Sequence, residues 1–159
     1  MTLRLNYTHL SADTFKKFYE FSNTVKNPSY GETIRGLIDI RVSQINGCAF
    51  CLDMHVKEAK IRGERDLRVH HVAIWRESPL FDAREKAALA WAETLTEIPV
   101  GGVSDAAYEA VREHFSEKEL SDLSFAIVAI NGWNRLSIGF ANTPGSQDKL
   151  FGLDKAGLN

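Results

Sequence analysis

Residues 43–55 read Ser-Gln-Ile-Asn-Gly-Cys-Ala-Phe-Cys-Leu-Asp-Met-His, and the prediction of the fold starts from this stretch. Its Asn-Gly pair is a turn signal, and an apolar run with helical spacing follows it. We therefore predict a helix over about residues 48–62, which Gly63 ends. At about 100° per residue, Cys48, Cys51 and His55 fall within an arc of about 60° on one face of that helix.

These three side chains are suited to thiol redox chemistry. A cysteine with an ordinary pKa near 8.5 is mostly protonated at neutral pH, whereas the thiolate is the nucleophile. The positive end of a helix dipole stabilises a thiolate in the first turn, and His55, one turn after Cys51, can take its proton. We therefore assign the attacking role to Cys51 and the proton relay to His55. Cys48 is then the resolving thiol, which condenses with a sulfenic acid on Cys51 to give a disulfide.

Three other interpretations of the cysteine pair stay open. A structural disulfide at this spacing would close only a very small loop. A zinc site needs about four ligands, and His70 or His71 could complete a set with Cys48, Cys51 and His55, but the chain has no second Cys-x-x-Cys. We therefore predict no metal. In the third interpretation both cysteines are inert core residues, since free cysteine is often buried.

Three stretches carry a resemblance to a known family: RVSQINGCAFCLDMH at residues 41–55, FDAREKAALAW at 81–91 and NGWNRL at 131–136. They resemble the alkylhydroperoxidase AhpD-like branch of the carboxymuconolactone decarboxylase superfamily, and the resemblance covers roughly residues 28–140. It implies an all-helical homo-oligomer, a trimer or a hexamer, whose Cys-x-x-Cys pair reduces peroxides with the second cysteine as the peroxidatic one. It also implies a glutamate in a proton relay twelve residues before the first cysteine, where this chain has Gly36.

Two glutamates are candidates for the acid that is missing at Gly36. Asp82-x-x-Glu85 is a capping-box pattern, which alone explains Glu85 as a helix cap. A carboxylate near His55 would also raise its basicity and orient its ring, so we include Glu85 among the catalytic candidates. Glu32 is a weaker candidate, because one helical turn, about 6 Å, takes it farther from the cysteines.

Length and composition fit one soluble globular domain over residues 1–159, with a core over about 11–140 and a polar, frayed tail over about 143–159. The net charge is −2 without a basic block, so we predict no nucleic-acid and no membrane partner. No apolar run approaches the roughly 18 residues of a transmembrane helix, and the first residues lack the apolar core of a signal peptide. We expect a reducing cytoplasm, where a close cysteine pair is more often catalytic than structural.

Helical periodicity and capping patterns predict an all-α fold, a bundle of about six to eight helices that associates through its apolar helices. Ser29-x-x-Glu32 and Ser116-x-x-Glu119 read as capping boxes. The residues after Ser116 are apolar on several sides, which indicates a helix buried centrally or at a subunit interface. Besides the segment 48–62, we expect helices over about residues 11–27, 32–45, 82–97, 104–115 and from 116 toward 140.

The sequence therefore predicts a thiol-dependent peroxidase or disulfide reductase without a bound cofactor, which depends on an external dithiol as electron donor. Cys51 attacks the O–O bond of the peroxide, His55 acts as general base and then as acid to the leaving alkoxide, and Cys48 resolves the oxidised intermediate. Two alternatives remain. One is a decarboxylase-like enzyme acting on a cyclic lactone, which does not need the cysteine pair. The other is a non-catalytic redox sensor or binding module, in which the pair is a switch.

Overall fold

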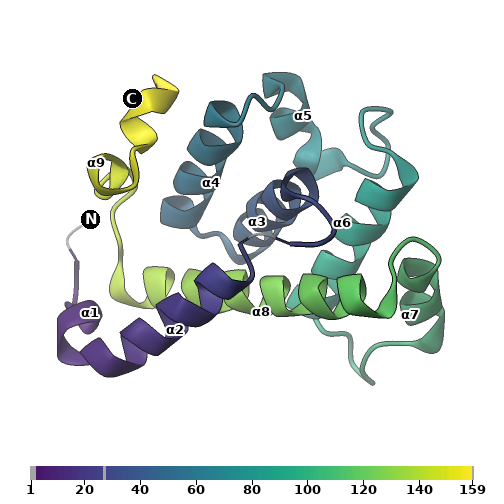
Figure 1. Cartoon of the computed structure of the whole chain (residues 1–159), viewed down its shortest axis with the longest axis horizontal. Coiled ribbons are helices and arrows are strands. Elements are labelled where there is room, and N and C mark those ends of the chain that lie inside the picture. The colour runs from purple at the N-terminus through teal and green to yellow at the C-terminus, as the bar shows by residue number, and fades with distance from the viewer. Residues whose placement is uncertain (1–2, 27, 159) are drawn as a thin grey trace.

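The computed structural model of the protein describes residues 3–26 and 28–158. The outermost residues of the expected 1–159 domain, Met1, Thr2 and Asn159, lie outside this range, as does Asn27. Over the described residues the chain forms nine α-helices and two short 3₁₀ helices and no strand, which confirms the all-α prediction. Figure 1 shows the long helix α8 along one side of the molecule, with α3, α4, α5 and α6 stacked over it.

The helices follow one another with short connections. Their bounds are α1 (Tyr7–Leu10), α2 (Ala12–Thr24), α3 (Glu32–Asn46), α4 (Ala49–Ile61), α5 (Asp66–His71), η1 (Val72–Ile74), α6 (Ala83–Thr96), α7 (Asp105–Arg112), α8 (Glu117–Phe140), α9 (Asp148–Phe151) and η2 (Leu153–Ala156). The count of α-helices exceeds the expected six to eight because α1 and α9 have four residues each, too few to show a helical period. No helix within the described residues has the length and apolar character needed to cross a lipid bilayer.

Helix α3 lies at the centre of the core, where it packs against α4, α6 and α8. Ile38 and Val42 of α3 are fully buried, as are Leu123 and Ile127 of α8. A helix that contacts neighbours on three sides must be apolar around most of its circumference. Asp39, also on α3, is therefore an exception, a carboxylate that is only 5% exposed inside a mostly apolar core.

Two of the three predicted capping boxes form in the structure. They begin α6 at Asp82 and α8 at Ser116. The capping box predicted at Ser29 is wrong. Helix α3 begins instead with Gly31 as its N-cap, at a φ of 101° that suits only glycine, without a side-chain cap. The hydroxyl of Ser29 bonds to Asp122 of α8 (3.1 Å), so a partner from elsewhere in the chain replaces the local cap.

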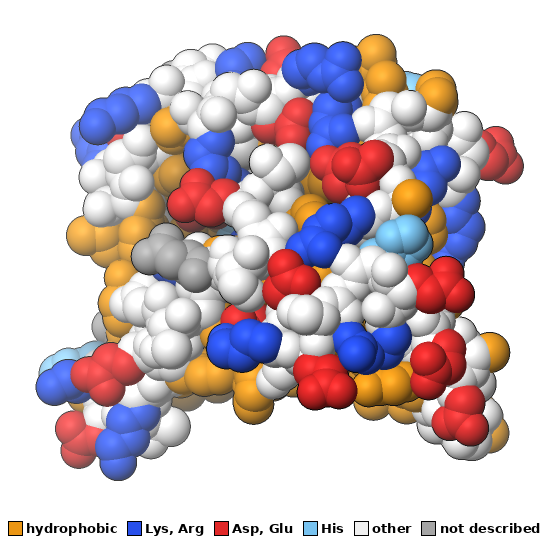
Figure 2. Space-filling view, turned by 45° about the vertical axis from the view of Figure 1, so that its right-hand side comes forward, with side chains coloured by type: hydrophobic (Ala, Val, Ile, Leu, Met, Phe, Trp, Pro, Cys, Tyr) orange, Lys and Arg blue, Asp and Glu red, His pale blue; other side chains and the backbone are white. Residues whose placement is uncertain are grey.

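Helix α8 is buried on one face and open on another. Phe125 and Val128 are 53% and 56% exposed, although Leu123 and Ile127 of the same helix are inaccessible to solvent. Within one chain α8 is therefore not buried on all sides, and the alternative of burial at a subunit interface stays a prediction. Figure 2 shows hydrophobic side chains along the lower edge of one face of the molecule and at its left and upper-right edges, with acidic and basic side chains spread over that face.

The C-terminal residues fold against α4, so the expectation of a frayed tail is wrong. Helix η2 packs on α4, and the Nζ atom of Lys57 lies 2.8 Å from Oδ2 of Asp53 and 2.7 Å from Oδ2 of Asp148 in α9. The backbone N–H of Gly145 donates to the same Asp53 oxygen (3.0 Å). Lys57 is only 5% exposed, and a buried ammonium needs such partners, which the tail supplies.

Candidate active site

The turn between α3 and α4 is held against α8 by a polar network. Gly47 adopts the left-handed conformation (φ 69°), which lets the chain reverse within two residues. The side-chain amide of Asn46 donates to Oδ1 of Asn131 (3.0 Å) and to Oδ1 of Asn134 (2.9 Å), which are both buried. These bonds fix the backbone that enters α4 and therefore the position of Cys48 at its N-cap.

Cys48 and Cys51 are joined in a disulfide at the first turn of α4, with their Cα atoms 5.4 Å apart. Helix α4 runs from Ala49 to Ile61, close to the predicted bounds. Sγ of Cys48 caps the helix by accepting a hydrogen bond from the backbone N–H of Cys51 (3.3 Å). The two residues are 2% and 3% exposed, so the disulfide lies in the main core. The structure thus has the pair in its oxidised form, at the positive end of a helix dipole.

His55 lies one turn after Cys51 on α4 and contacts two carboxylates. Its Nδ1 atom is 2.8 Å from Oε2 of Glu58 and 3.9 Å from Oδ2 of Asp39. Asp39 is in turn bound by the guanidinium of Arg35 (2.8 Å) one turn earlier on α3. The imidazole is therefore held between one carboxylate of its own helix and one of the neighbouring helix.

The electrostatics of this group favour the protonated imidazole. Burial lowers the pKa of His55, but the negative charges of Asp39 and Glu58 outweigh burial and hold that pKa above its ordinary value. For Glu58, burial raises the pKa, and the hydrogen bond and charge of His55 outweigh it, so the pKa of this carboxyl lies below its usual range. Because Nδ1 faces the carboxylates, Nε2 is the ring nitrogen left to exchange a proton with another group.

Asp39 and Glu58, the acids next to His55, are missing from the prediction made from the sequence. Glu58 had a local signal, since a glutamate three residues after a histidine lies on the same helix face. Asp39 had a weaker one, a lone acid within the apolar run Leu-Ile-Asp-Ile-Arg at residues 37–41. Nothing in either pattern shows that α3 and α4 bring Asp39 to His55, because that contact is made between two helices.

Glu85, the acid proposed from the sequence, has other partners. Its carboxylate binds the guanidinium of Arg68, with Oε1 2.5 Å from Nη2 and Oε2 3.1 Å from Nη1. It also accepts the backbone N–H of Asp82 (3.0 Å), which completes the capping box of α6. The structure therefore assigns Glu85 to the cap and to the ion pair with Arg68, and the carboxylates beside His55 are Asp39 and Glu58.

Gly36 lies at the position where the resemblance implies a glutamate, and Arg62 lies close to it. Gly36 is buried in α3, and a Cβ atom built there would lie 2.8 Å from Nη2 of Arg62. The guanidinium of Arg62 thus takes up space that a side chain at position 36 would need. Arg62 also lies 4.0 Å from Glu58, so one cation contacts both the carboxylate partner of His55 and the space over Gly36.

Three other polar side chains have structural partners. Arg41 binds Glu93 (2.7 Å). Nδ1 of His71, which was considered as a zinc ligand, lies 3.0 Å from the hydroxyl of Ser78. Trp133 donates from its ring N–H to the hydroxyl of a buried serine on α2 (2.7 Å), which ties α2 to α8.

With this geometry established, comparisons with known proteins identify the family. The sequence pattern of the family described as "Carboxymuconolactone decarboxylase family" matches residues 12–94. The chain is also 40% identical over 147 residues to the uncharacterised protein YdfG of Bacillus subtilis, which spans 92% of this chain and 100% of YdfG. The chain belongs to the carboxymuconolactone decarboxylase family.

Further relatives place this family member in the AhpD-like branch. A solved structure from Agrobacterium tumefaciens, ATU0492, has a TM-score of 0.85 and 39% identity, and the match covers 90% of this chain and 98% of that one. ATU0492 is described as a protein of unknown function and, provisionally, as the antioxidant defence protein AhpD. The uncharacterised protein YnjA of Escherichia coli is 35% identical over 108 residues, which span 67% of this chain and 56% of YnjA. The resemblance stated from the sequence motifs is thus confirmed.

Proposed function

We propose that this AhpD-like protein is a thiol-dependent peroxidase, with Cys51 as the peroxidatic and Cys48 as the resolving cysteine. The observation that supports this most is the joining of the two sulfurs in a disulfide at the start of α4, on the helix face that also carries His55. A sulfur in the first turn of a helix gains stabilisation of its thiolate from the helix dipole. Cys51 lies inside that turn, whereas Cys48 is the cap.

In the first step, the Cys51 thiolate attacks one oxygen of the peroxide. The O–O bond breaks, an S–O bond forms, and the other oxygen leaves as an alkoxide. His55 has taken the proton of the Cys51 thiol at Nε2 and returns it to the alkoxide, which leaves as an alcohol. Cys51 is then a sulfenic acid, oxidised by two electrons, and the peroxide has been reduced by two electrons.

In the second step, Cys48 attacks the sulfenic sulfur. A disulfide forms, and the hydroxyl group leaves as water with the proton from the Cys48 thiol. An external dithiol then reduces the disulfide by two thiol–disulfide exchanges and becomes a disulfide itself. If the protein did not reduce peroxide, the thiol–disulfide exchange with the external dithiol would still make it a disulfide reductase.

The relay in this proposal differs from the one that the family resemblance implies. Asp39 and Glu58 orient the imidazole through Nδ1 and favour its protonated form, so they take the place of the glutamate absent at Gly36. Arg35 fixes Asp39 through an ion pair to Oδ2, the oxygen that also faces His55. These three residues are positioning residues, since they act on the sulfurs only through His55.

We also propose that the protein works as a homo-oligomer in a reducing cytoplasm. The exposed side chains of Phe125 and Val128 on α8 give it an apolar face that a second copy could cover. A reducing compartment would supply the dithiol that returns the Cys48–Cys51 pair to its active form.

The direct test is peroxide turnover. The reduced protein is mixed with tert-butyl hydroperoxide and an excess of dihydrolipoamide, and loss of peroxide is followed against a protein-free control. Cys51→Ser should abolish turnover. In Cys48→Ser the reaction should stop after the first step. Cys51 should then remain a sulfenic acid, which is detected by its labelling with dimedone. Turnover that survives Cys51→Ser would contradict the proposed nucleophile.

The same variants separate the two alternatives. A lactone decarboxylase would act on its substrate when both cysteines are replaced by serine, and a redox sensor would form the disulfide with peroxide but would not turn over. The wild-type protein should instead consume many equivalents of peroxide for each disulfide present.

A further inference from the structure

A pocket of about 580 Å³ lies between α3, the end of α4, α5 and α6, at the end of α4 opposite to the disulfide. From Cys51 to Arg62, α4 extends about 16 Å, so a ligand in this pocket would not reach the sulfurs. The pocket is lined by Glu32, Thr33, Gly36, Leu37, Ile40, Ala59, Arg62, Gly63, Glu64, Arg65, Arg68 and Glu85.

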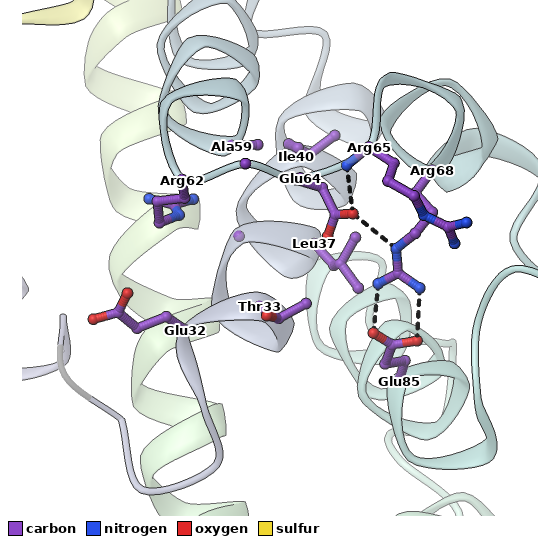
Figure 3. A pocket seen from close by; sticks show the side chains of 12 residues that line it. Glu32, Thr33, Leu37, Ile40, Ala59, Arg62, Glu64, Arg65, Arg68 and Glu85 are labelled. Atoms are coloured by element: carbon purple, nitrogen blue, oxygen red, sulfur yellow. Dashed lines mark hydrogen bonds and ion pairs between the residues drawn. The ribbon is translucent and has the colours of Figure 1, made fainter.

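Some of the charged side chains in this pocket form ion pairs with each other, and others do not. Figure 3 shows Arg62 on one side and, on the other, Arg68 between the carboxylates of Glu64 and Glu85. Arg68 is thus saturated, with its Nε atom 2.9 Å from Glu64 and its Nη2 atom 2.5 Å from Glu85. Arg65 makes no ion pair within residues 3–26 and 28–158, and the single ion pair of Arg62 there is the 4.0 Å contact with Glu58.

Arg62 and Arg65 are therefore the cations that the pocket offers to a ligand. A guanidinium presents a planar fork of N–H donors that matches a carboxylate group. Leu37, Ile40 and Ala59 line the same pocket with apolar surface, which favours an organic ligand over an inorganic anion. Glu32 lies at the edge near Arg62 and opposes an anion, so it limits the affinity (Figure 3).

We propose that this pocket binds a small organic carboxylate through Arg62, and that the bound anion controls the proton relay of the redox site. The second half of the proposal rests on the proposed function of His55. The link is a row of side chains along α4, in which His55 Nδ1 lies 2.8 Å from Glu58 and Glu58 lies 4.0 Å from Arg62. A carboxylate that engages Arg62 neutralises the cation next to Glu58.

The sign of the effect follows from the charges around the pair. The charged groups that act on His55 and Glu58 are Asp39 and Arg35 of α3, Arg62 at the C-cap of α4 and Lys26 after α2. Arg62 contributes to the low pKa of Glu58. When an anion cancels that contribution, the pKa of Glu58 rises, and the added negative charge also raises the pKa of His55. The bound carboxylate thus keeps the imidazole protonated to higher pH, which favours the ion pair of the imidazolium with the Cys51 thiolate.

Titration of His55 by NMR tests both halves without an activity assay. The ring C–H signal of His55, identified with His55→Asn, is followed from pH 5 to 9 in benzoate, in acetate, in phosphate and in chloride at one ionic strength. We expect benzoate to raise the pKa of His55 above the chloride value and to bind about tenfold more tightly than acetate, because of its ring. Phosphate should bind more weakly than benzoate.

Four variants separate binding from coupling. Arg62→Gln should raise the pKa of His55 without ligand, weaken benzoate binding about tenfold and remove the response to benzoate. Arg65→Gln should weaken binding and leave the basal pKa of His55 unchanged, since Arg65 does not contact Glu58. Glu32→Gln should tighten binding. Lys60→Gln, an exposed cation of the same helix that does not line the pocket, is the matched control and should change neither quantity.

Three results would overturn the proposal. The first is a pKa of His55 that is the same in benzoate and in chloride. The second is benzoate binding that survives Arg62→Gln unchanged, and the third is phosphate binding tighter than benzoate. Failure of the peroxidase proposal would look different. The protein would then not consume peroxide, while benzoate would still raise the pKa of His55.

Discussion

Nδ1 of His55 and Oε2 of Glu58 lie 2.8 Å apart, three residues from each other on one face of α4. In the proposed mechanism this pair takes the role that the family resemblance implies for a glutamate at position 36, which in this chain is glycine. Asp39 on α3 adds a second carboxylate 3.9 Å from the same nitrogen. Two acids on different helices thus hold one imidazole, and a change in either should alter its titration.

Glu58→Gln should lower the pKa of His55 and the rate of Cys51 oxidation. The variant removes the negative charge that favours the imidazolium but keeps a side chain of the same shape. Proton transfer by a positioned group contributes about 10²–10⁴-fold to a rate. We therefore expect His55→Asn to lower the rate of Cys51 oxidation by this factor, and Glu58→Gln to lower it by less. Stopped-flow oxidation of the reduced protein over pH 5–9 measures both. Asp66→Asn, a change of an exposed carboxylate, is the control and should leave the profile unchanged.

The stability of the protein should depend on pH in two windows. His55 has a pKa above its ordinary value, so its contribution is complete below about pH 6.5 and is lost as the pH rises through the native pKa. Glu58 has a lowered pKa, so its contribution is present above about pH 4.3 and is lost as the pH falls through the native value. Urea unfolding of the wild type should therefore show a maximum between these limits. Glu58→Gln should flatten the curve on both sides, and an unchanged curve would contradict the pairing.

Glu85→Gln should destabilise the fold and leave the redox chemistry intact. Glu85 forms the cap of α6 and binds Arg68, and both side chains of the ion pair are about one-tenth exposed. Removing its charge leaves a mostly buried guanidinium with one carboxylate fewer, which should cost about 1–3 kcal/mol in the free energy of unfolding. Urea titration measures the loss, and the pKa of His55 should not move. A double change, Arg68→Gln with Glu85→Gln, should recover part of the loss. A lower rate of Cys51 oxidation in the folded Glu85→Gln protein would show that Glu85 takes part in the redox site after all.

Charged substitutions on the open face of α8 should dissociate the homo-oligomer. Phe125 and Val128 are more than half exposed in the single chain, and burying such side chains on association would stabilise a trimer or hexamer. Native mass spectrometry and sedimentation should show the oligomer for the wild type and monomers for Phe125→Glu with Val128→Glu. A wild type that is monomeric at micromolar concentration would contradict this expectation. Lys149→Glu, a change in α9 away from this face, is the control.

Much of the local structure could be predicted from the sequence, because its signals lie within a few residues of each other. The helix α4 follows from its apolar period and from Gly63, and the capping boxes of α6 and α8 follow from Asp82 and Ser116. The pairing of Cys48 with Cys51 depends only on the spacing of two residues on one helix. Each of these features keeps its geometry wherever the helix lies in the fold.

What only the tertiary structure decided are contacts between residues far apart in the chain. The packing of α3 on α4 brings Asp39 to His55, and the contact of Glu85 with Arg68 draws that glutamate into another pair. Ser29 follows the capping pattern but bonds to Asp122 of α8 instead, while α3 begins at Gly31. The sequence by itself therefore determined which residues can carry the chemistry, since that depends on residue type and helical spacing. Which acids lie beside His55 depends also on how the helices pack, and a local sequence pattern does not contain this information.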